Sequence, residues 1–152
     1  MGKWFECKVR YDKMTDKGIP KKVTESYLID ALSFTEAEAR IIKEITPYMS
    51  GEFSVSAVKK TNIAEIFFSD QPDDDKWYSV KAAFITIDEV KAIEKKTNVL
   101  YTVQACDFET ALKNFVEGMG QGFDYDIVSI TETPIMEVYK EDLSAVVKKE
   151  QN

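Results

Sequence analysis

Two tryptophan–lysine pairs with the same spacing are the first residues in this sequence whose types suit chemistry. Trp4 and Lys8 are four positions apart, and Trp77 and Lys81 repeat the pattern. Residues four apart in an extended strand lie on the same face. An aromatic ring beside an ammonium group can stack on a base and contact a phosphate. The pairs therefore predict a binding face for nucleic acid, a nucleotide or a small anionic ligand.

Four further lysines extend this predicted face, because they fall in the strands expected beside the two pairs. The complete set of predicted ligand-binding residues is Trp4, Lys8, Lys21, Lys22, Trp77, Lys81, Lys95 and Lys96. A second interpretation is that each tryptophan packs one copy, or one subunit, against another, with the lysine stems beside the ring. The net charge of −7 disfavours a general phosphate-binding surface and favours this packing interpretation.

A pair of glutamates is the remaining catalytic candidate. Glu65 and Glu137 occupy equivalent positions of an internal repeat that is described below. Two convergent carboxylates can supply the general acid and the general base of a hydrolysis. The alternative is that both are ordinary exposed residues of strands. The pair predicts a small enzyme only if the two side chains face each other.

Other motifs point away from catalysis. The sequence has no histidine, which is the commonest general base and metal ligand. Cys7 and Cys106 therefore lack a His partner, and they are predicted to be reduced and inert. The glycines between Gly118 and Gly122 follow a predicted helix, so they indicate a flexible turn rather than a dinucleotide motif. The acidic run Asp73–Asp75 lacks calcium-loop spacing and is predicted to be a solvated linker. We expect no metal and no cofactor, and the balance is against an enzyme.

The tryptophan–lysine pairs belong to a longer internal repeat. The segment Lys21–Ala37 resembles Lys95–Ala111, and the offset between the copies is 73 or 74 residues. Each copy has about 70 residues, near the lower limit for an independent core, so the copies are expected to pack as one globular unit. The predicted divisions are repeat one at 1–70, an acidic linker at 71–76, repeat two at 77–140, and a short helix with a polar tail at 141–152.

Hydrophobic alternation predicts the element order β-β-α-β-β in each copy. The predicted strands are Trp4–Tyr11, Lys21–Leu32, Glu52–Val58 and Ile63–Phe68 in the first copy, and Trp77–Ile87, Lys95–Ala105, Ile127–Thr131 and Ile135–Tyr139 in the second. The predicted fold class is α+β, with antiparallel sheets that are each covered by one helix. Two arrangements stay open: the free faces can stack, or the sheets can join edge to edge.

Each copy also carries the signals of one helix. Ser33 and Asp107 are predicted caps, and the helices are expected to run through Ile45 and to about Glu117. Apolar residues at helical spacing predict the faces that turn inward. They are Phe34, Ala37, Ile41, Ile42 and Ile45 in the first helix, and Phe108, Ala111, Leu112 and Phe115 in the second.

Several stretches of the sequence resemble a known family. The opening W-F-E-C-K-V-R-Y, the block A-L-S-F-T-E-A-E-A-R, and the segments S-G-E-F-S-V-S and E-I-F-F-S-D carry the resemblance. The family consists of proteins of about this length, with a domain of unknown function, from gut-type bacteria and their phages. The resemblance covers nearly the whole chain and implies a bacterial or phage protein in the cytoplasm of its host cell. It brings no catalytic motif, and it suggests replication or interference with host defence as contexts.

Composition completes the prediction. The 152 residues are 44% hydrophobic and 31% charged, as in a globular protein, with no stretch of about 20 apolar residues that would enter a membrane. Residues 1–70 are neutral, so the linker and second copy carry the whole net charge of −7. We predict a non-catalytic binding or assembly protein that forms homo-oligomers. The alternatives are a nucleic-acid or nucleotide binder that uses the Trp/Lys face, and a small enzyme that uses Glu65 and Glu137.

Overall fold

The computed structural model describes residues 3–140 and has an α+β fold with two sheets and two helices. The chain divides into two compact units. Unit 1 combines the described residues of Met1–Thr61 with those from Ile135 onward, and unit 2 is Asn62–Pro134. The helix predicted at 141–152 lies outside the described residues.

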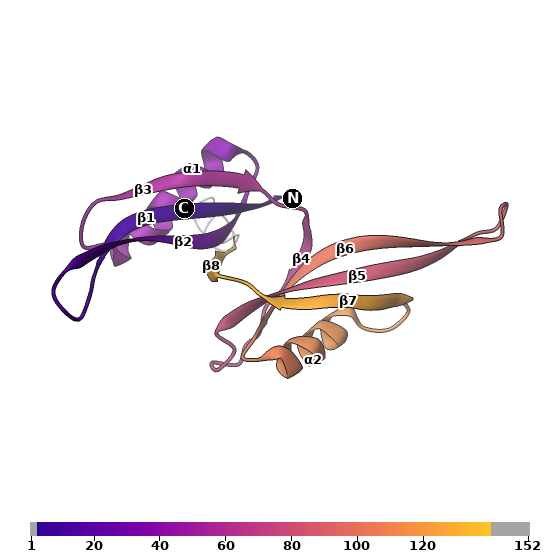
Figure 1. Cartoon of the computed structure of the whole chain (residues 1–152). Helices are drawn as coiled ribbons and strands as arrows, with labels where there is room; N and C mark the ends of the chain where they lie inside the picture. The colour runs from indigo at the N-terminus through magenta and orange to yellow at the C-terminus, as the bar shows by residue number, and fades with distance from the viewer. Residues whose placement is uncertain (1–2, 141–152) are drawn as a thin grey trace, which may run out of the picture. The chain divides into compact units, whose positions relative to one another are not determined.

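Unit 1 is a four-stranded sheet with one helix over one face (Figure 1). The strand order is β3-β1-β2-β8. Its elements are β1 (Lys3–Met14), β2 (Pro20–Ala31), α1 (Phe34–Ile45), the short 3₁₀ helix η1 (Thr46–Tyr48), β3 (Phe53–Lys60) and β8 (Ile135–Tyr139).

Unit 2 repeats this arrangement with its own helix over one face (Figure 1). The strand order is β4-β6-β5-β7. Its elements are β4 (Ile63–Phe67), β5 (Lys76–Asp88), β6 (Ile93–Ala105), α2 (Phe108–Met119) and β7 (Tyr125–Glu132).

Strand alternation and helix spacing build one core in each unit, as the sequence patterns require. Every second residue of the central strands points toward the helix, where small alanines let the helix approach the sheet. The buried residues of the first core are Phe5, Cys7, Val9, Tyr27, Ile29, Ala31, Ala37, Ile41 and Ile45. Those of the second core are Tyr78, Val80, Ala82, Tyr101, Val103, Ala105, Ala111 and Phe115.

Both predicted helix caps are present. The Ser33 hydroxyl accepts from the Glu36 N–H at 3.1 Å, and the Glu36 carboxylate accepts from the Leu32 N–H at 3.2 Å. The Asp107 carboxylate accepts from the Thr110 N–H at 2.7 Å. These bonds satisfy amides that a helix start otherwise leaves without partners, so they fix where each helix begins.

The fourth strand of each sheet comes from the other sequence copy, which corrects the predicted sheets. The order β-β-α-β-β occurs twice along the chain, but β4 follows β3 and pairs with β6, while β8 follows β7 and pairs with β2. Both of these pairings are parallel, whereas the sequence predicted antiparallel sheets. The two copies thus exchange their last strands.

Connector length explains this exchange. Only Thr61 and Asn62 separate β3 from β4, so the three Cα steps from Lys60 to Ile63 span at most about 11 Å. To take the place that β8 occupies beside β2, β4 would have to cross from one edge of the sheet to the other. That crossing covers three strand spacings, or about 14 Å. The strand therefore cannot take the place beside β2 in the sheet of its own copy.

The same kind of hydrogen-bonded anchor stands at the end of β3 and at the end of β7. The N–H and the hydroxyl of Thr61 both donate to the Trp4 carbonyl, at 3.0 and 2.8 Å. Thr133 makes the same two bonds to the Trp77 carbonyl, at 2.9 and 2.8 Å. Pro134 follows Thr133, and a residue before proline favours extended backbone. Each anchor ends one strand at a fixed point, and at Thr133 the following proline also favours an extended exit.

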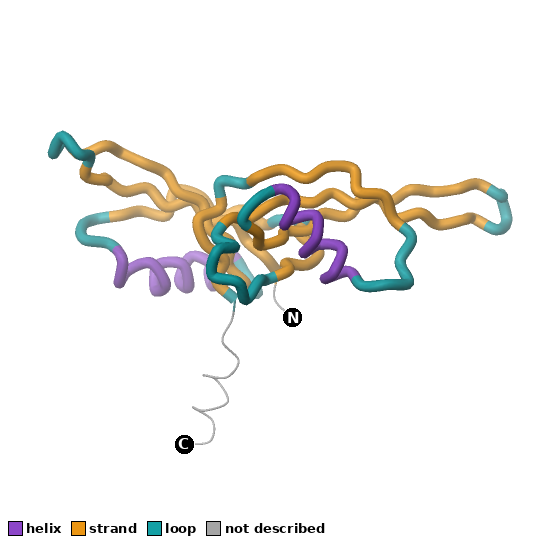
Figure 2. The backbone as a smooth tube through the Cα atoms, turned by 90° about the horizontal axis from the view of Figure 1, so that it is seen from below, coloured by secondary structure: helices purple, strands orange, loops and turns teal. Residues whose placement is uncertain are grey.

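The hairpins run past the strands beside them. Pairing of β1 with β2 continues to Met14 and Pro20, and pairing of β5 with β6 continues to Asp88 and Ile93. The strand β7 reaches β5 only as far as Phe84, so the end of the second hairpin projects beyond it (Figure 2).

Candidate functional site

The two tryptophans lie on the sheet faces opposite the helices, as predicted, but in different surroundings. Trp4 is half-buried and Lys8, on the same face of β1, is exposed. Trp77 is only 2% exposed, and its ring meets that of Phe68 edge-on, with 5.7 Å between centroids. Lys81 is exposed. A tryptophan ring covered to this extent offers no open face on which a base could stack.

The other predicted lysines lie far along the hairpins from the tryptophans. Lys22 is opposite Asp12, eight residues along β1 from Trp4, which corresponds to about 27 Å. Lys21, Lys95 and Lys96 are likewise opposite Lys13, Thr86 and Ile85. Lys96 lies 3.5 Å from the Asp126 carboxylate. The structure therefore does not bring the eight predicted residues into one patch.

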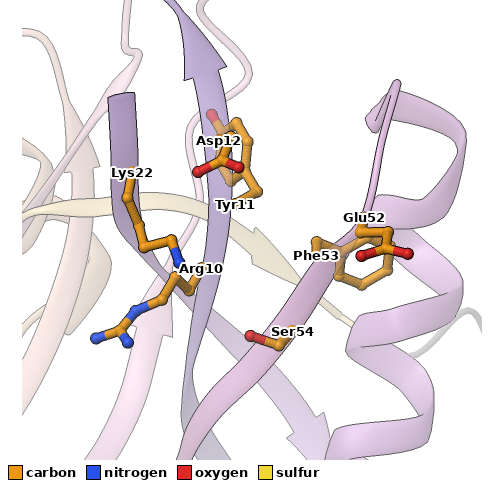
Figure 3. A pocket seen from close by; sticks show the side chains of 7 residues that line it. All are labelled: Arg10, Tyr11, Asp12, Lys22, Glu52, Phe53 and Ser54. Atoms are coloured by element: carbon orange, nitrogen blue, oxygen red, sulfur yellow. The ribbon is translucent and has the colours of Figure 1, made fainter. Parts of the chain in front are cut away.

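One of these lysines lines a small groove with residues that the sequence did not single out (Figure 3). The groove has a volume of about 210 Å³ and lies toward the turn end of the first hairpin, where β3 starts to pair with β1. Its cations are Arg10 and Lys22, and Ser54 adds a hydroxyl. The carboxylates of Asp12 and Glu52 also line it, so its charge is mixed rather than basic. Arg10 shares the alternation of Trp4 and Lys8, which is the signal that could have identified it.

The two candidate glutamates belong to different units. Glu65 lies in β4 opposite Tyr101, and Glu137 lies in β8 opposite Tyr27. Each tyrosine belongs to the core beneath its own helix, so each glutamate is on the helix side of its own sheet. Burial, followed by nearby negative charges that include Glu137, raises the pKa of Tyr27 to about 12. Strand exchange places Glu65 in unit 2 and Glu137 in unit 1.

The acidic run is exposed at Asp73 and Asp75, but at Asp74 it is not the solvated segment that the sequence predicted. Asp74 is 5% exposed. Its Oδ2 accepts from the Ser69 hydroxyl and, at 3.3 Å, from the Asn114 amide of α2. The Asn114 amide also donates to the Gln104 carbonyl at 2.9 Å. Asp74 therefore ties the loop after β4 to the helix of unit 2, and this buried polar network has a structural role.

The cysteines offer no activated nucleophile. Cys7 is buried in the first core. Burial, with the nearby charges of Glu38 and Glu6, raises the pKa of its thiol to about 11, so the thiol stays protonated at neutral pH. The partly exposed Cys106 lies 3.4 Å from the Thr110 hydroxyl. Among residues 3–140, no group of three or more His, Cys, Asp and Glu side chains is placed to hold a metal ion.

The most conspicuous surface feature was missed by sequence reasoning. The outer side of α1 carries exposed apolar residues that the sequence expected to point inward: Phe34 is 54% exposed and Ile42 is 39% exposed. Together with Val58 of β3 they line an open groove of about 360 Å³. Only the inner edge of the Phe34 ring is held, by an edge-on contact with Phe5 at 5.1 Å between centroids.

The second helix repeats this feature more strongly. Phe108, Leu112 and Val116 are four residues apart and follow one side of α2, with exposures of 56%, 43% and 46%. The Phe108 ring meets the Tyr78 ring edge-on at 5.0 Å between centroids, as Phe34 meets Phe5. The helix α2 contacts β7 as α1 contacts β3. The inward face of α2 holds only Ala111 and Phe115 as fully buried residues, which corrects the predicted inward positions of Phe108 and Leu112.

The strand beside each helix stripe stands at the edge of its sheet. β3 and β7 are each eight residues long and form one outer strand of their sheets. Within residues 3–140, no strand pairs with their outer sides. We call α1 with Phe34, Ile42 and β3 the first flank, and α2 with Phe108, Leu112, Val116 and β7 the second flank.

Comparison with known proteins gives a match to one family model. A family model described as "Domain of unknown function (DUF4494)" matches residues 3–141. A search of curated proteins gives no match. In the part of the chain that the structure describes, no helix is long and apolar enough to cross a membrane.

Proposed function

Since the chain belongs to the family of Domain of unknown function (DUF4494), whose description names no activity, we propose its function from its surfaces. The protein is a non-catalytic binding and assembly module. It consists of a duplicated, pseudo-symmetric unit, and the first and second flanks are its working surfaces.

The observation that carries this proposal is that each flank combines two kinds of unsatisfied surface. An edge strand presents N–H and C=O groups that can pair with another chain. The helix beside it presents large exposed apolar side chains. On α2 they form the continuous row Phe108, Leu112 and Val116, and on α1 they are Phe34 and Ile42 on either side of Glu38. Single exposed apolar residues are ordinary, whereas a contiguous row beside a free strand edge indicates a protein interface.

The exchanged strands support the same proposal. β4 and β8 have five residues each, compared with eight in β3 and β7. Short edge strands offer little backbone to a partner. The exchange therefore leaves one long free edge in each unit, and both are beside a helix stripe.

Site-specific photo-crosslinking in expressing cells tests this function. A photo-crosslinking amino acid replaces Ile42 on the first flank or Leu112 on the second, and Glu89, exposed in a hairpin turn, serves as the control position. We expect protein crosslinks at one or both flanks well above the control. Crosslinks no more frequent at Ile42 and Leu112 than at Glu89 would contradict the proposal.

A second candidate function rests on the groove in Figure 3, where Arg10, Lys22 and Ser54 present two cations and a hydroxyl to one small space. These groups suit a small anionic ligand or a phosphate of a nucleic acid. Titration with inorganic phosphate and with a labelled single-stranded oligonucleotide tests it. Binding should weaken with salt and in Lys22→Ala. The absence of any salt-sensitive binding at low ionic strength excludes this candidate.

A further inference from the structure

We infer that the flanks bind a second copy of this chain, with β3 of one molecule antiparallel to β7 of the next. This inference rests on the proposed function and names its partner. It follows from the charges of the two edge strands and from the order of side chains along them.

The edge strands have opposite charges. β3 ends with Lys59 and Lys60, and Lys60 lies so close to Lys3 that this contact lowers its pKa. β7 carries Asp126 near its start and Glu132 at its end, and it has no cation of its own. Lys96 and Lys76 of the same unit lie 3.5 and 3.6 Å from these two carboxylates in exposed ion pairs, which are weak and leave the acidic groups accessible to a further cation. In a fully overlapping antiparallel pair, two β3 strands would place Lys59 opposite Ser54, and two β7 strands would place Asp126 opposite Thr131, so neither pair gains an ion pair. A β3 strand beside a β7 strand brings opposite charges together.

The difference extends to the two units. Unit 2, at residues 62–134, contains six lysines, no arginine and fourteen acidic residues, for a net charge of −8. The remainder of the chain therefore has a net charge of +1. Association of unit 1 of one molecule with unit 2 of another avoids contact between two strongly acidic units.

One register of the two strands fits both faces of the sheet. With Phe53 opposite Glu132 and Lys60 opposite Tyr125, the eight residues of each strand overlap completely. The strands are F-S-V-S-A-V-K-K and Y-D-I-V-S-I-T-E. In this register Val58 faces Ile127, and Val55 faces Ile130. All four side chains pack against the cores beneath the helices.

The bulges in the two strands select this register. The pairing of β1 with β3 shifts between Lys8 and Val9, and that of β5 with β7 shifts between Lys81 and Ala82. A bulge interrupts the alternation of faces. The residues left unpaired by the bulges are Ser56 in β3 and Val128 in β7. In the complete-overlap register they occupy neighbouring positions, so on both sides of the bulges the helix-side residues of β3 oppose the helix-side residues of β7. A shift by two residues breaks this match on one side of the bulge.

The same register aligns charge and apolar surface. Lys59 faces Asp126 on the side of the sheet away from the helices. Because both helices then lie on one side of a continuous sheet, the Leu112 stripe of one molecule approaches the groove that Phe34 and Ile42 line on the other. Apolar area leaves water on one side of the seam, and an ion pair forms on the other.

The contact joins two different surfaces, so each added molecule leaves one β3 edge and one β7 edge free. Such a contact produces a closed ring, of two or more molecules, or an open chain of molecules. We therefore expect association that increases with concentration.

Sedimentation of charge variants tests the partner and the contact together. The purified chain should form concentration-dependent oligomers. Lys59→Glu should weaken the association constant about tenfold or more, because it places two carboxylates opposite each other. The double variant Lys59→Glu with Asp126→Lys should recover association. Lys17→Glu, the same charge change at an exposed lysine in the turn of the first hairpin, should leave it unchanged.

Disulfide crosslinking fixes the register. Equal amounts of a Lys59→Cys chain and an Asp126→Cys chain, both without Cys106, should form a mixed disulfide under air. Ser54→Cys with Asp126→Cys, on the same face but out of register, should not. A chain that stays monomeric at high concentration overturns the inference, as does a Ser54–Asp126 crosslink in place of the predicted one. Flank crosslinks to a different protein in cells would overturn only the inference and leave the proposed function standing.

Discussion

Replacing Gly118 by alanine tests the packing of an exchanged strand in detail. Gly118 lies inside α2, not in the turn after it as the sequence predicted. An ideal Cβ at this position would lie 2.7 Å from Cδ1 and 3.0 Å from Cε1 of Phe67 in β4. The Phe67 ring packs against Tyr101 and Phe115, each at 5.8 Å between centroids. The ring therefore cannot move away from a new methyl group without disturbing two neighbours.

Two opposing effects set the size of the change. Alanine in place of glycine in a helix favours the folded state by at most about 1 kcal/mol. Overpacking a fixed ring costs about 1–3 kcal/mol. The cost of overpacking exceeds the gain in helix propensity, because the aromatic cluster holds Phe67 in place. We expect Gly118→Ala to lower the free energy of unfolding by about 1 kcal/mol.

A double-mutant cycle measured by urea denaturation isolates this contact. In a Phe67→Leu background the ring is gone, so Gly118→Ala should become neutral or slightly stabilising, with a coupling energy of about 1–2 kcal/mol. Gly51→Ala, where an added Cβ meets nothing within 4 Å, is the control. If Gly118→Ala stabilises the chain equally in both backgrounds, Phe67 does not pack on α2 and the reasoning fails.

Three further predictions concern the buried polar and ionisable groups. Asp74→Ala should cost about 1–3 kcal/mol in denaturant unfolding, because Asn114 and a hydroxyl lose their acceptor, while the exposed Asp73→Ala should stay within about 0.5 kcal/mol; equal effects would contradict the network. A thiol reagent at pH 8 should label the partly exposed Cys106 and spare the buried Cys7, whose thiol pKa is raised to about 11; rapid labelling of Cys7 in the folded chain would refute this. Since burial raises the pKa of Cys7 to about 11 and of Tyr27 to about 12, the folded state holds these protons more tightly than the unfolded state. The free energy of unfolding should thus keep this contribution in full below about pH 9 and lose it as the pH rises to 12. The loss should be less steep in Tyr27→Phe. If urea unfolding gives the same dependence of this free energy on pH in the wild type and in Tyr27→Phe, the prediction is wrong.

Local patterns in the sequence predicted the local structure well. The alternation from Trp4 to Tyr11 placed Phe5 and Cys7 toward the core, and the structure agrees. The caps at Ser33 and Asp107 were identified correctly, because a cap depends on residues within one helical turn. These features are set by neighbours in the chain, which a single sequence contains.

Strand exchange lay outside what periodicity can predict. The pattern of Ile63–Phe67 marks a strand but does not name its partner, which depends on the two-residue connector and on the whole sheet. The burial of Asp74 was missed for a similar reason. An acidic run in a linker resembles a solvated segment until the helix that supplies Asn114 is placed beside it.

The flanks were missed because the helices carry more apolar residues than one face can bury. Sequence reasoning counted Phe34, Ile42 and Leu112 as core, since each lies at a helical spacing from a core residue. The separate row Phe108, Leu112 and Val116, at intervals of four, was the available signal for a second apolar side. The predicted Trp/Lys site stays a prediction for Trp4 and Lys8, while the lysines near the hairpin ends lie too far away to join it.

The central claim is that the two sequence copies exchange their last strands and thereby leave β3 and β7 as long free edges. A disulfide between β4 and β6 tests it most directly, in a chain that lacks Cys7 and Cys106. Ile63 lies opposite Leu100, at the strand spacing of about 4.8 Å, which a disulfide can bridge. Ser26 is the matched alternative, because it occupies the same place in β2, opposite Ile135.

Peptide mass mapping of monomeric chains after air oxidation gives the answer. The account predicts that Ile63→Cys with Leu100→Cys forms a bond within one chain, and that Ile63→Cys with Ser26→Cys stays reduced. The opposite result, a bond to position 26 and none to position 100, would show that β4 completes its own sheet and would contradict the account.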